Sequence, residues 1–149
     1  MKAVIQRVSK TVLKVDGELV SKIEKGLVVY LGVKVGDKKE SADYLAKKIA
    51  NMRIFEDENG KMNLSVKDVD GEVLVVSQFT LLADTSHGNR PSFMLAEKPD
   101  IATELYEYFV SIMQNCYQIP TKKGVFGADM KIEQHNDGPV TILMDCVQI

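Results

Sequence analysis

The sequence is poor in metal ligands and in residues that form disulfides. Its 149 residues include only two cysteines, Cys116 and Cys146, two histidines and no tryptophan. The cysteines form no CxxC pair and have no histidine cluster beside them, so the pattern favours neither a zinc site nor a disulfide framework. We expect both cysteines to be buried thiols and the protein to require no metal.

Long hydrophobic runs are also absent. The longest apolar run, 27–33, is interrupted by Gly32 and is far shorter than the roughly 20 residues that cross a bilayer. The first residues contain neither the apolar core nor the cleavage site of a signal peptide. We therefore expect a cytoplasmic protein without membrane contact.

The chain has no excess of charge of one sign. With 19 basic and 21 acidic side chains, its net charge is −2. No global positive field then holds it on a polyanion, which excludes a histone-like DNA coat but not an enzyme that handles one end of an RNA. We expect no DNA partner. The length and the hydrophobic share of 45% predict a single folded domain over residues 1–149.

The first third of the chain alternates apolar segments with turn signals. Its predicted strands are 3–8, 11–15, 18–23 and 27–33. Asp16-Gly17 indicates a hairpin, because glycine accepts the positive φ of the turn and aspartate tolerates it. Segment 27–31 has no polar alternation, so we expect that strand to be covered on both faces.

Two later segments, 39–51 and 100–115, have the apolar spacing of helices. Asp37 and Glu40 resemble a capping pair before the first helix, and Pro99 precedes the second. The other predicted strands are 52–56, 61–65, 72–76, 130–134 and 140–147. Because strands come in hairpins, we expect an α+β fold: a compact, mostly antiparallel curled sheet or β-barrel-like core with two main helices. No GxGxxG or P-loop motif supports a nucleotide cofactor.

Polar residues follow the predicted strand 72–76. Ser77, Gln78 and Thr80 flank Phe79 where the chain leaves this buried strand. They would place polar side chains and free backbone N–H groups at a sheet edge, where sites are commonly built. A strand that simply frays into a loop is the alternative. Thr80 has no evident neighbouring base that would make it a nucleophile.

Segment 136–141 (NDGPVT) is the second stretch with two interpretations. Asn, Asp, Gly and Pro all favour a turn. Proline is nevertheless a poor way to enter a central strand, because it lacks a hydrogen-bond donor. Elsewhere, His87 in a polar loop is more often solvated than catalytic. Phe126 could lie beside a ligand or pack in the core.

Four segments, 1–8, 77–81, 124–130 and 136–141, together resemble the D-aminoacyl-tRNA deacylase family, also called D-tyrosyl-tRNA deacylase. The resemblance covers the whole chain. It implies a homodimer with two sites at the subunit interface. It also implies hydrolysis of the ester that joins a D-amino acid to the 3′-terminal adenosine of tRNA, with glycyl-tRNA as a secondary substrate and no cofactor.

The resemblance assigns chiral selection to Gly138-Pro139. It implies that this peptide bond is cis and that one subunit inserts it into the other subunit's site. An L-residue would drive its side chain into this backbone, whereas a D-residue directs its side chain outward. Arg7 is a candidate to brace the inserted peptide by donating to its carbonyls. The alternative role of Arg7 is an outward strand charge.

The expected chemistry uses the backbone N–H groups near Phe79 and Thr80 to stabilise developing negative charge. We favour attack by water assisted by the ribose 2′-hydroxyl, with covalent catalysis by Thr80 as the alternative. Ser77 and Gln78 would position the adenosine, and Phe126 would stack on its base. Other expected contacts are Met130 and Asn136 to the substrate and Lys122 and Lys123 to phosphate, with a solvated charged loop as the alternative for the two lysines. A non-catalytic binder of charged tRNA ends and a hydrolase of free D-amino-acid esters are the competing functions.

Overall fold

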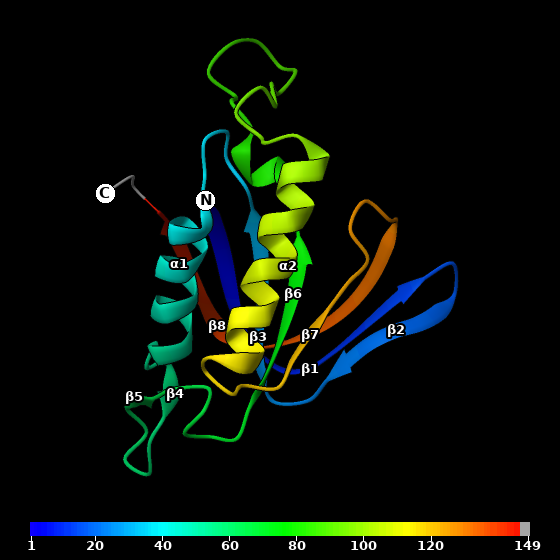
Figure 1. Ribbon diagram of the computed structural model, residues 1–149. Coiled ribbons are helices and arrows are strands. Elements are labelled where there is room, and N and C mark those ends of the chain that lie inside the picture. Colours follow the sequence, from blue (N-terminus) through cyan, green and yellow to red (C-terminus); the bar gives the residue numbers. More distant parts are fainter. Residues whose placement is uncertain (147–149) are drawn as a thin grey trace.

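The computed structural model describes residues 1–146 as a mixed sheet with two helices on one face (Figure 1). The strand order is β2-β1-β3-β6-β7, and β8 pairs with the other edge of β1. The strands of this sheet are β1 (Lys2–Val15), β2 (Glu18–Ile23), β3 (Gly26–Gly32), β6 (Glu72–Ser77), β7 (Thr121–Lys123) and β8 (Met130–Asp145). The other elements are α1 (Lys39–Asn51), α2 (Pro99–Asn115), the 3-10 helix η1 (Phe79–Leu82) and the separate pair β4 (Phe55–Glu56) and β5 (Met62–Leu64).

Antiparallel and parallel pairs both occur in the main sheet. β1 is antiparallel to β2, β3 and β8, whereas β3–β6 and β6–β7 are parallel. The α+β class with two main helices is confirmed. The parallel pairs were not predicted, because hairpin signals report only neighbours along the chain and β3 reaches β6 through α1 and the β4–β5 hairpin.

Two pairs of predicted strands are single long strands. Segments 3–8 and 11–15 merge in β1, and 130–134 merges with the following predicted strand in β8. Position 147 of that prediction lies outside the described residues. β1 and β8 pair from Lys2 opposite Asp145 to Val15 opposite Met130. The helix predictions agree with α1 and α2 within one residue at each end, whereas η1 and β7 were not predicted.

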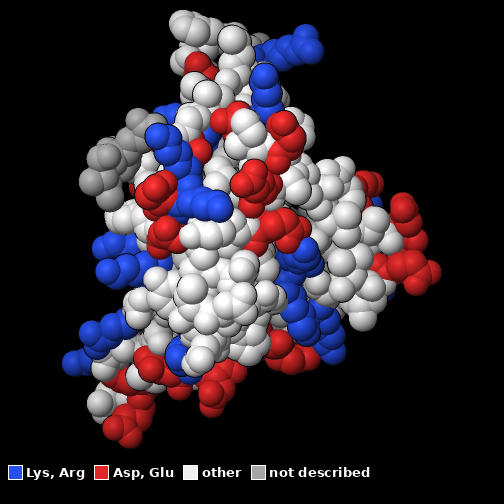
Figure 2. Space-filling view, in the orientation of Figure 1, with Lys and Arg blue, Asp and Glu red and all other residues white. Residues whose placement is uncertain are grey.

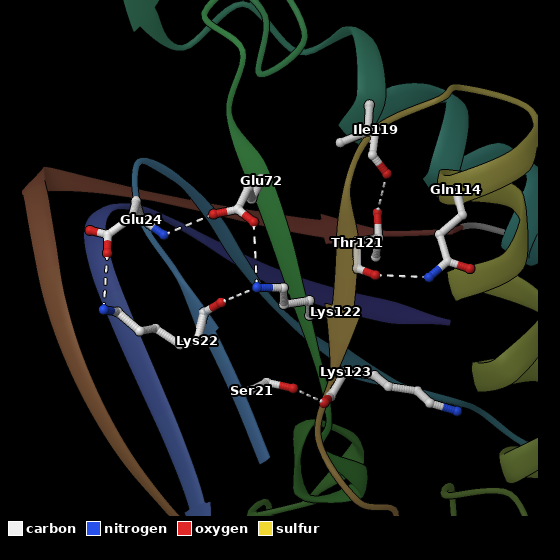
Figure 3. Close-up of polar contacts among 9 residues, drawn as sticks. All are labelled: Ser21, Lys22, Glu24, Glu72, Gln114, Ile119, Thr121, Lys122 and Lys123. Atoms are coloured by element: carbon white, nitrogen blue, oxygen red, sulfur yellow. Dashed lines mark hydrogen bonds and ion pairs between the residues drawn. The ribbon is translucent and has the colours of Figure 1, made fainter. Parts of the chain in front are cut away.

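The sheet curls until its outer strands meet. Ser21 Oγ on β2 donates a hydrogen bond to the carbonyl of Lys123 on β7 (Figure 3). Lys122 Nζ donates to the carbonyl of Lys22 at 2.6 Å. These contacts join the two ends of the strand order, which gives the barrel-like core.

Two buried apolar clusters cover opposite faces of β3 and β6. The cluster beneath the helices includes Leu27, Val29, Leu45, Val73, Val75 and Phe109. The cluster inside the curl consists of Val8, Leu13, Ile23, Val28, Leu74 and Val76. Full burial of one such side chain contributes about 1.5–3 kcal/mol, so these strands form a firm platform for the polar turn at the end of β6. The prediction that 27–31 is covered on both faces is confirmed.

Two local predictions were wrong. Asp37 does not cap α1; its carboxylate lies 2.6 Å from the Met1 ammonium group, and the Lys38 N–H donates instead to Ser41 Oγ. Cys116 is exposed and Cys146 is only half-buried. Cys116 follows the last residue of α2 as its C-cap, so it lies beyond the apolar stripe of the helix.

Candidate functional site

The segment 77–81 turns sharply where β6 ends. Ser77 is the last residue of β6, and the Gln78 N–H donates to the carbonyl of Leu31 on β3 (2.9 Å). The chain then enters η1, in which the Leu81 N–H donates to the Gln78 carbonyl (3.2 Å). The first N–H groups of a helical turn have no partner within it. Among residues 1–146, those of Phe79 and Thr80 donate to no backbone carbonyl and can meet a ligand. A buried strand thus ends in a fixed turn that presents backbone donors.

This turn forms one wall of a cavity of about 310 Å³. Residues 126–130, Val76 and Ile132 complete the lining with Ser77, Gln78 and Phe79. The two walls meet because β7 runs parallel to β6, and the Gly124 N–H donates to the Val75 carbonyl (3.2 Å). Two of the motifs singled out in the sequence therefore lie on one cavity.

Gly124 makes the approach of the second wall possible. A Cβ at this position would lie 2.5 Å from Met130 Sδ and 3.2 Å from Leu13 Cδ1. Any larger residue would therefore push Met130, a lining residue, out of its place. The glycine therefore leaves room for the Met130 side chain in its present place.

A second, mostly apolar cavity of about 530 Å³ adjoins the first and shares Ser77, Phe79, Phe126 and Gly127 with it. Its other lining residues are Val33, Phe93, Ala96, Glu97, Lys98, Pro99 and Ala102. The Phe79 ring is 54% exposed and meets the edge of the Phe93 ring at 5.2 Å between centroids. Exposed aromatic faces beside an apolar cavity suit a flat, hydrophobic ligand group.

Phe126 is held between the two cavities by Tyr106 of α2. The two rings are tilted against each other with 6.0 Å between centroids. Tyr106 is fixed in turn, because its hydroxyl donates to the Val75 carbonyl (2.8 Å) and burial raises its pKa. Phe126 therefore lies on a rigid support, with part of its ring available to a ligand.

Thr80 is exposed, and its hydroxyl is not activated. Gln78 Nε2 donates to Thr80 Oγ1. Within residues 1–146, no carboxylate or imidazole makes a hydrogen bond to this hydroxyl. A donor directed at Oγ1 reduces its nucleophilicity, because it occupies an oxygen lone pair.

Gly138 and Pro139 lie in a bulge of β8 and not between two strands. Gln6 pairs with Thr141 and Val8 with Asn136, so five steps along β8 face two steps along β1. Residues 137–140 therefore leave the ladder and project from the sheet. The Gly138-Pro139 peptide bond is cis, and both residues are exposed.

Arg7 anchors this bulge from the core. The residue is only 6% exposed, so its side chain points inward and is not an outward strand charge. Its Nε donates to the Asp137 carbonyl (2.9 Å), and its Nη1 donates to the Ile54 carbonyl (2.7 Å). Nε also lies 3.3 Å from Asp137 Oδ2. The guanidinium group thus holds the residue that precedes Gly138.

One chain does not bring all predicted site residues together. Ser77, Gln78, Phe79, Phe126 and Met130 line the first cavity. Neither cavity is lined by Thr80, by Arg7 or by any residue of 136–139. The reason is topological: Ser77 pairs with β3, whereas the bulge lies beyond β1, and Arg7 pairs with the opposite end of β3.

Lys122 and Lys123 are engaged within the chain. Lys122 Nζ lies 3.6 Å from a carboxylate oxygen of Glu72 (Figure 3), and Lys123 Nζ lies 2.6 Å from Glu107. Neither lysine lines the two cavities. Both contribute to the closure of the curled sheet.

Sequence reasoning missed the wall formed by Phe93 and residues 96–99. The signal in the sequence was the apolar run Phe93-Met94-Leu95, which follows a long polar loop. In the structure all three side chains are exposed, as expected of an apolar surface that binds a ligand. Over the described part of the chain, no three His, Cys, Asp or Glu side chains are placed to hold a metal ion. None of the helices there is long and apolar enough to cross a membrane.

Known proteins resemble this chain over almost its whole length. Residues 4–145 match the family described as D-Tyr-tRNA(Tyr) deacylase. The chain is 52% identical over 145 residues to a D-aminoacyl-tRNA deacylase of Flavobacterium psychrophilum, covering 97% of each chain. It is 53% identical over 149 residues to a D-aminoacyl-tRNA deacylase of Thermosipho africanus, covering 100% of this chain and 99% of that protein.

Solved structures share the fold over almost the whole chain. One named c-Myc DNA Unwinding Element Binding Protein has a TM-score of 0.93 and 41% identity, with 99% of each chain covered. A probable eukaryotic D-amino acid tRNA deacylase has a TM-score of 0.84 at 16% identity, with 97% of this chain and 98% of that chain covered. The sequence matches extend over both walls of the cavity and over the bulge in β8. The chain therefore belongs to the D-Tyr-tRNA(Tyr) deacylase family.

Proposed function

We propose that the protein hydrolyses the ester of D-aminoacyl-tRNA and releases the free D-amino acid and tRNA as a proofreading step. The observation that carries this function is the cavity in which the turn 77–79 and the segment 126–130 meet. It offers backbone donors for an ester carbonyl next to an apolar cavity for a nucleobase. Glycyl-tRNA, which carries no side chain at the stereocentre, is the expected secondary substrate.

The two cavities suggest how the tRNA end lies in the site. The terminal adenine occupies the larger cavity, with its face on Phe126 and its edge toward Phe79. Ser77, which lines both cavities, and Gln78 then lie near the ribose, and the aminoacyl ester extends into the smaller cavity. Stacking on an aromatic face contributes about 1–3 kcal/mol per base, so it favours binding of a single-stranded end in this place.

Hydrolysis then needs a stabilised oxyanion and an oriented water molecule. The N–H groups of Phe79 and Thr80 are the donors for the developing charge, and loss of one such donor typically costs about 2.7–4 kcal/mol of barrier. The ribose 2′-hydroxyl assists the attacking water. The geometry supports this mechanism over covalent catalysis, because Thr80 Oγ1 accepts a hydrogen bond from Gln78.

Gly138 and Pro139 act in the site of a second copy of the chain. Three observations support a homodimer of this kind: the bulge projects from the sheet, it is exposed, and it lies away from the cavities of its own chain. Inserted into the partner's site, its backbone would collide with an L side chain and leave room for a D side chain. Asn136, beside the bulge, would then lie near the substrate.

The expected RNA contact is local, and the expected location is the cytoplasm. Acidic and basic side chains are interspersed on the face that carries the helices (Figure 2). The net charge is −2. Both features favour a grip on a single-stranded 3′ end over a broad contact with DNA.

The test is hydrolysis of D-Tyr-tRNA and L-Tyr-tRNA by the purified protein. We expect multiple turnovers on the D-ester and little hydrolysis of the L-ester. Equal rates on both would refute chiral selection, and binding without turnover would show a non-catalytic module. Faster hydrolysis of D-tyrosine methyl ester than of D-Tyr-tRNA would favour a hydrolase of small esters.

The mechanism is tested with Thr80→Ala and with D-Tyr-tRNA ending in 2′-deoxyadenosine. We expect Thr80→Ala to keep most of kcat, because the side chain only accepts a hydrogen bond from Gln78. We expect the 2′-deoxy substrate to react much more slowly. The reverse pattern would refute assistance by the 2′-hydroxyl and favour covalent catalysis by Thr80.

A further inference from the structure

A chain of side-chain hydrogen bonds crosses the sheet face opposite Arg7. Tyr30 OH on β3 donates to Gln134 Oε1 on β8 (2.8 Å). Gln134 Nε2 donates to Gln6 Oε1 on β1 (2.6 Å), and Gln6 Nε2 donates to Thr141 Oγ1 (3.2 Å). Gln134 Nε2 uses its second hydrogen for Asn136 Oδ1. Five side chains from three strands thus form one connected network.

This network has a single direction. Each glutamine accepts through its oxygen and donates through its nitrogen, so the order of donors runs from Tyr30 to Gln134 to Gln6. Burial raises the pKa of Tyr30, so its hydroxyl keeps the proton that starts the chain. A flip of one amide alone, at Gln6 or at Gln134, would set like groups against each other, so the orientations of the two side chains are coupled.

The network ends on the two residues that flank the bulge. Asn136 and Thr141 are the residues that rejoin the β1 ladder on either side of residues 137–140. Arg7 holds the Asp137 carbonyl from the other face of β1, because successive side chains on a strand point in opposite directions. The segment that carries Gly138 and Pro139 is therefore fixed at three points.

We propose that Tyr30, Gln6 and Gln134 are positioning residues that set chiral discrimination. The proposal rests on the proposed role of Gly138-Pro139 as the chiral selector. A selector that works by collision must be placed to within about 0.5 Å, since a displaced backbone leaves room for the L side chain. None of the three residues lines the two cavities, so they act on the reaction only through the bulge.

The proposal is tested with Tyr30→Phe and Gln134→Met. Tyr108→Phe is the matched control, because it removes a tyrosine hydroxyl that donates to Asp43 (3.0 Å) on the helix side of the molecule. The measured quantity is kcat/KM for D-Tyr-tRNA divided by that for L-Tyr-tRNA. One neutral hydrogen bond contributes little in net terms, so we expect this ratio to fall by about 3- to 10-fold in each test variant and to stay unchanged in Tyr108→Phe.

The hydrolysis of D-Tyr-tRNA itself should change by less than about twofold, since a D side chain points away from the selector. Because the residues act through one network, the double variant should discriminate no worse than Gln134→Met alone. A ratio that stays at the wild-type value in both single variants would overturn the proposal and leave the proposed function intact. So would equal losses on the D- and L-esters. A wild-type protein without discrimination would instead overturn the proposed function and this proposal with it.

Discussion

Replacing Arg7 with methionine tests the anchor of the β8 bulge most directly. Methionine preserves the apolar stem of the buried side chain but removes both hydrogen bonds to backbone carbonyls. Hydrogen bonds from a charged donor contribute about 1.5–3 kcal/mol each. Water can replace the donor at the partly exposed Asp137 carbonyl, but the bond to the Ile54 carbonyl is buried. We therefore expect a loss of about 2–3 kcal/mol in the free energy of unfolding.

The assays are thermal unfolding and the ratio of D- to L-Tyr-tRNA hydrolysis. For a domain of this size, the expected loss lowers Tm by about 5–10 °C. We expect the ratio of D- to L-Tyr-tRNA hydrolysis to fall by about tenfold because the bulge is displaced. This change corresponds to about 1.4 kcal/mol in the difference between the two activation free energies. Arg7→Lys should lie between Arg7→Met and the wild type, because one ammonium group cannot reach both carbonyls in the geometry of a guanidinium fork.

Arg53→Met provides the matched control. Arg53 Nε also donates to a backbone carbonyl, that of Asn63 (2.8 Å), but both residues are exposed. Its loss should change stability by no more than about 0.5 kcal/mol. If Arg7→Met unfolds at the same temperature as Arg53→Met, or discriminates as well as the wild type, the inference that Arg7 holds the bulge is refuted.

Two further predictions concern the walls of the site, and a third concerns the turn at Asp84. Phe126→Ala should raise KM for D-Tyr-tRNA by roughly 5- to 100-fold with little change in kcat, since it removes about 1–3 kcal/mol of base stacking; an unchanged KM in steady-state kinetics would place the base elsewhere. Gly124→Ala should cost about 1–3 kcal/mol in thermal unfolding, because the new Cβ would lie 2.5 Å from Met130 Sδ, and adding Met130→Ala should restore part of it. The hydroxyl and N–H of Ser86 lower the pKa of Asp84, so this turn is stabilised at neutral pH and loses that support only as the pH falls through the lowered pKa. In an NMR titration, the Ser86 amide should shift at a lower pH than in the denatured chain.

The sequence predicted features that depend on neighbouring residues. Asp16-Gly17 forms its hairpin turn with positive φ at both residues, since the two-residue turn is specified by its own backbone preferences. The segment 27–31 is covered on both faces because apolar side chains point to both sides of the strand. The parallel β3–β6 pair is different, because it depends on where a 39-residue excursion returns to the sheet. The residues of β3 and β6 themselves do not indicate that the two strands pair.

The candidate site was predicted by motif but not by geometry. Segment 77–81 follows a buried strand, and Phe126 follows a short one, so each could be recognised alone. That they share a cavity depends on the β6–β7 register and on the absence of a Cβ at Gly124. Segment 136–141 was expected to be a turn between strands. It is a bulge within one strand, because β1 is long enough to pair with both of its flanks.

The adjacent residues Gln6 and Arg7 connect the first strand to the bulge in β8. A strand alternates its side chains between faces, so two consecutive residues are the smallest unit that can hold a neighbouring loop from both sides. Arg7 takes the core face and the Asp137 carbonyl, whereas Gln6 takes the opposite face and Thr141. A shift of β1 by one residue would exchange these faces and bury the glutamine where the guanidinium group now satisfies two carbonyls. With Gly138-Pro139 in its proposed role, the register of β1 against β8 is therefore a condition for chiral selection, although no residue of β1 lines either cavity.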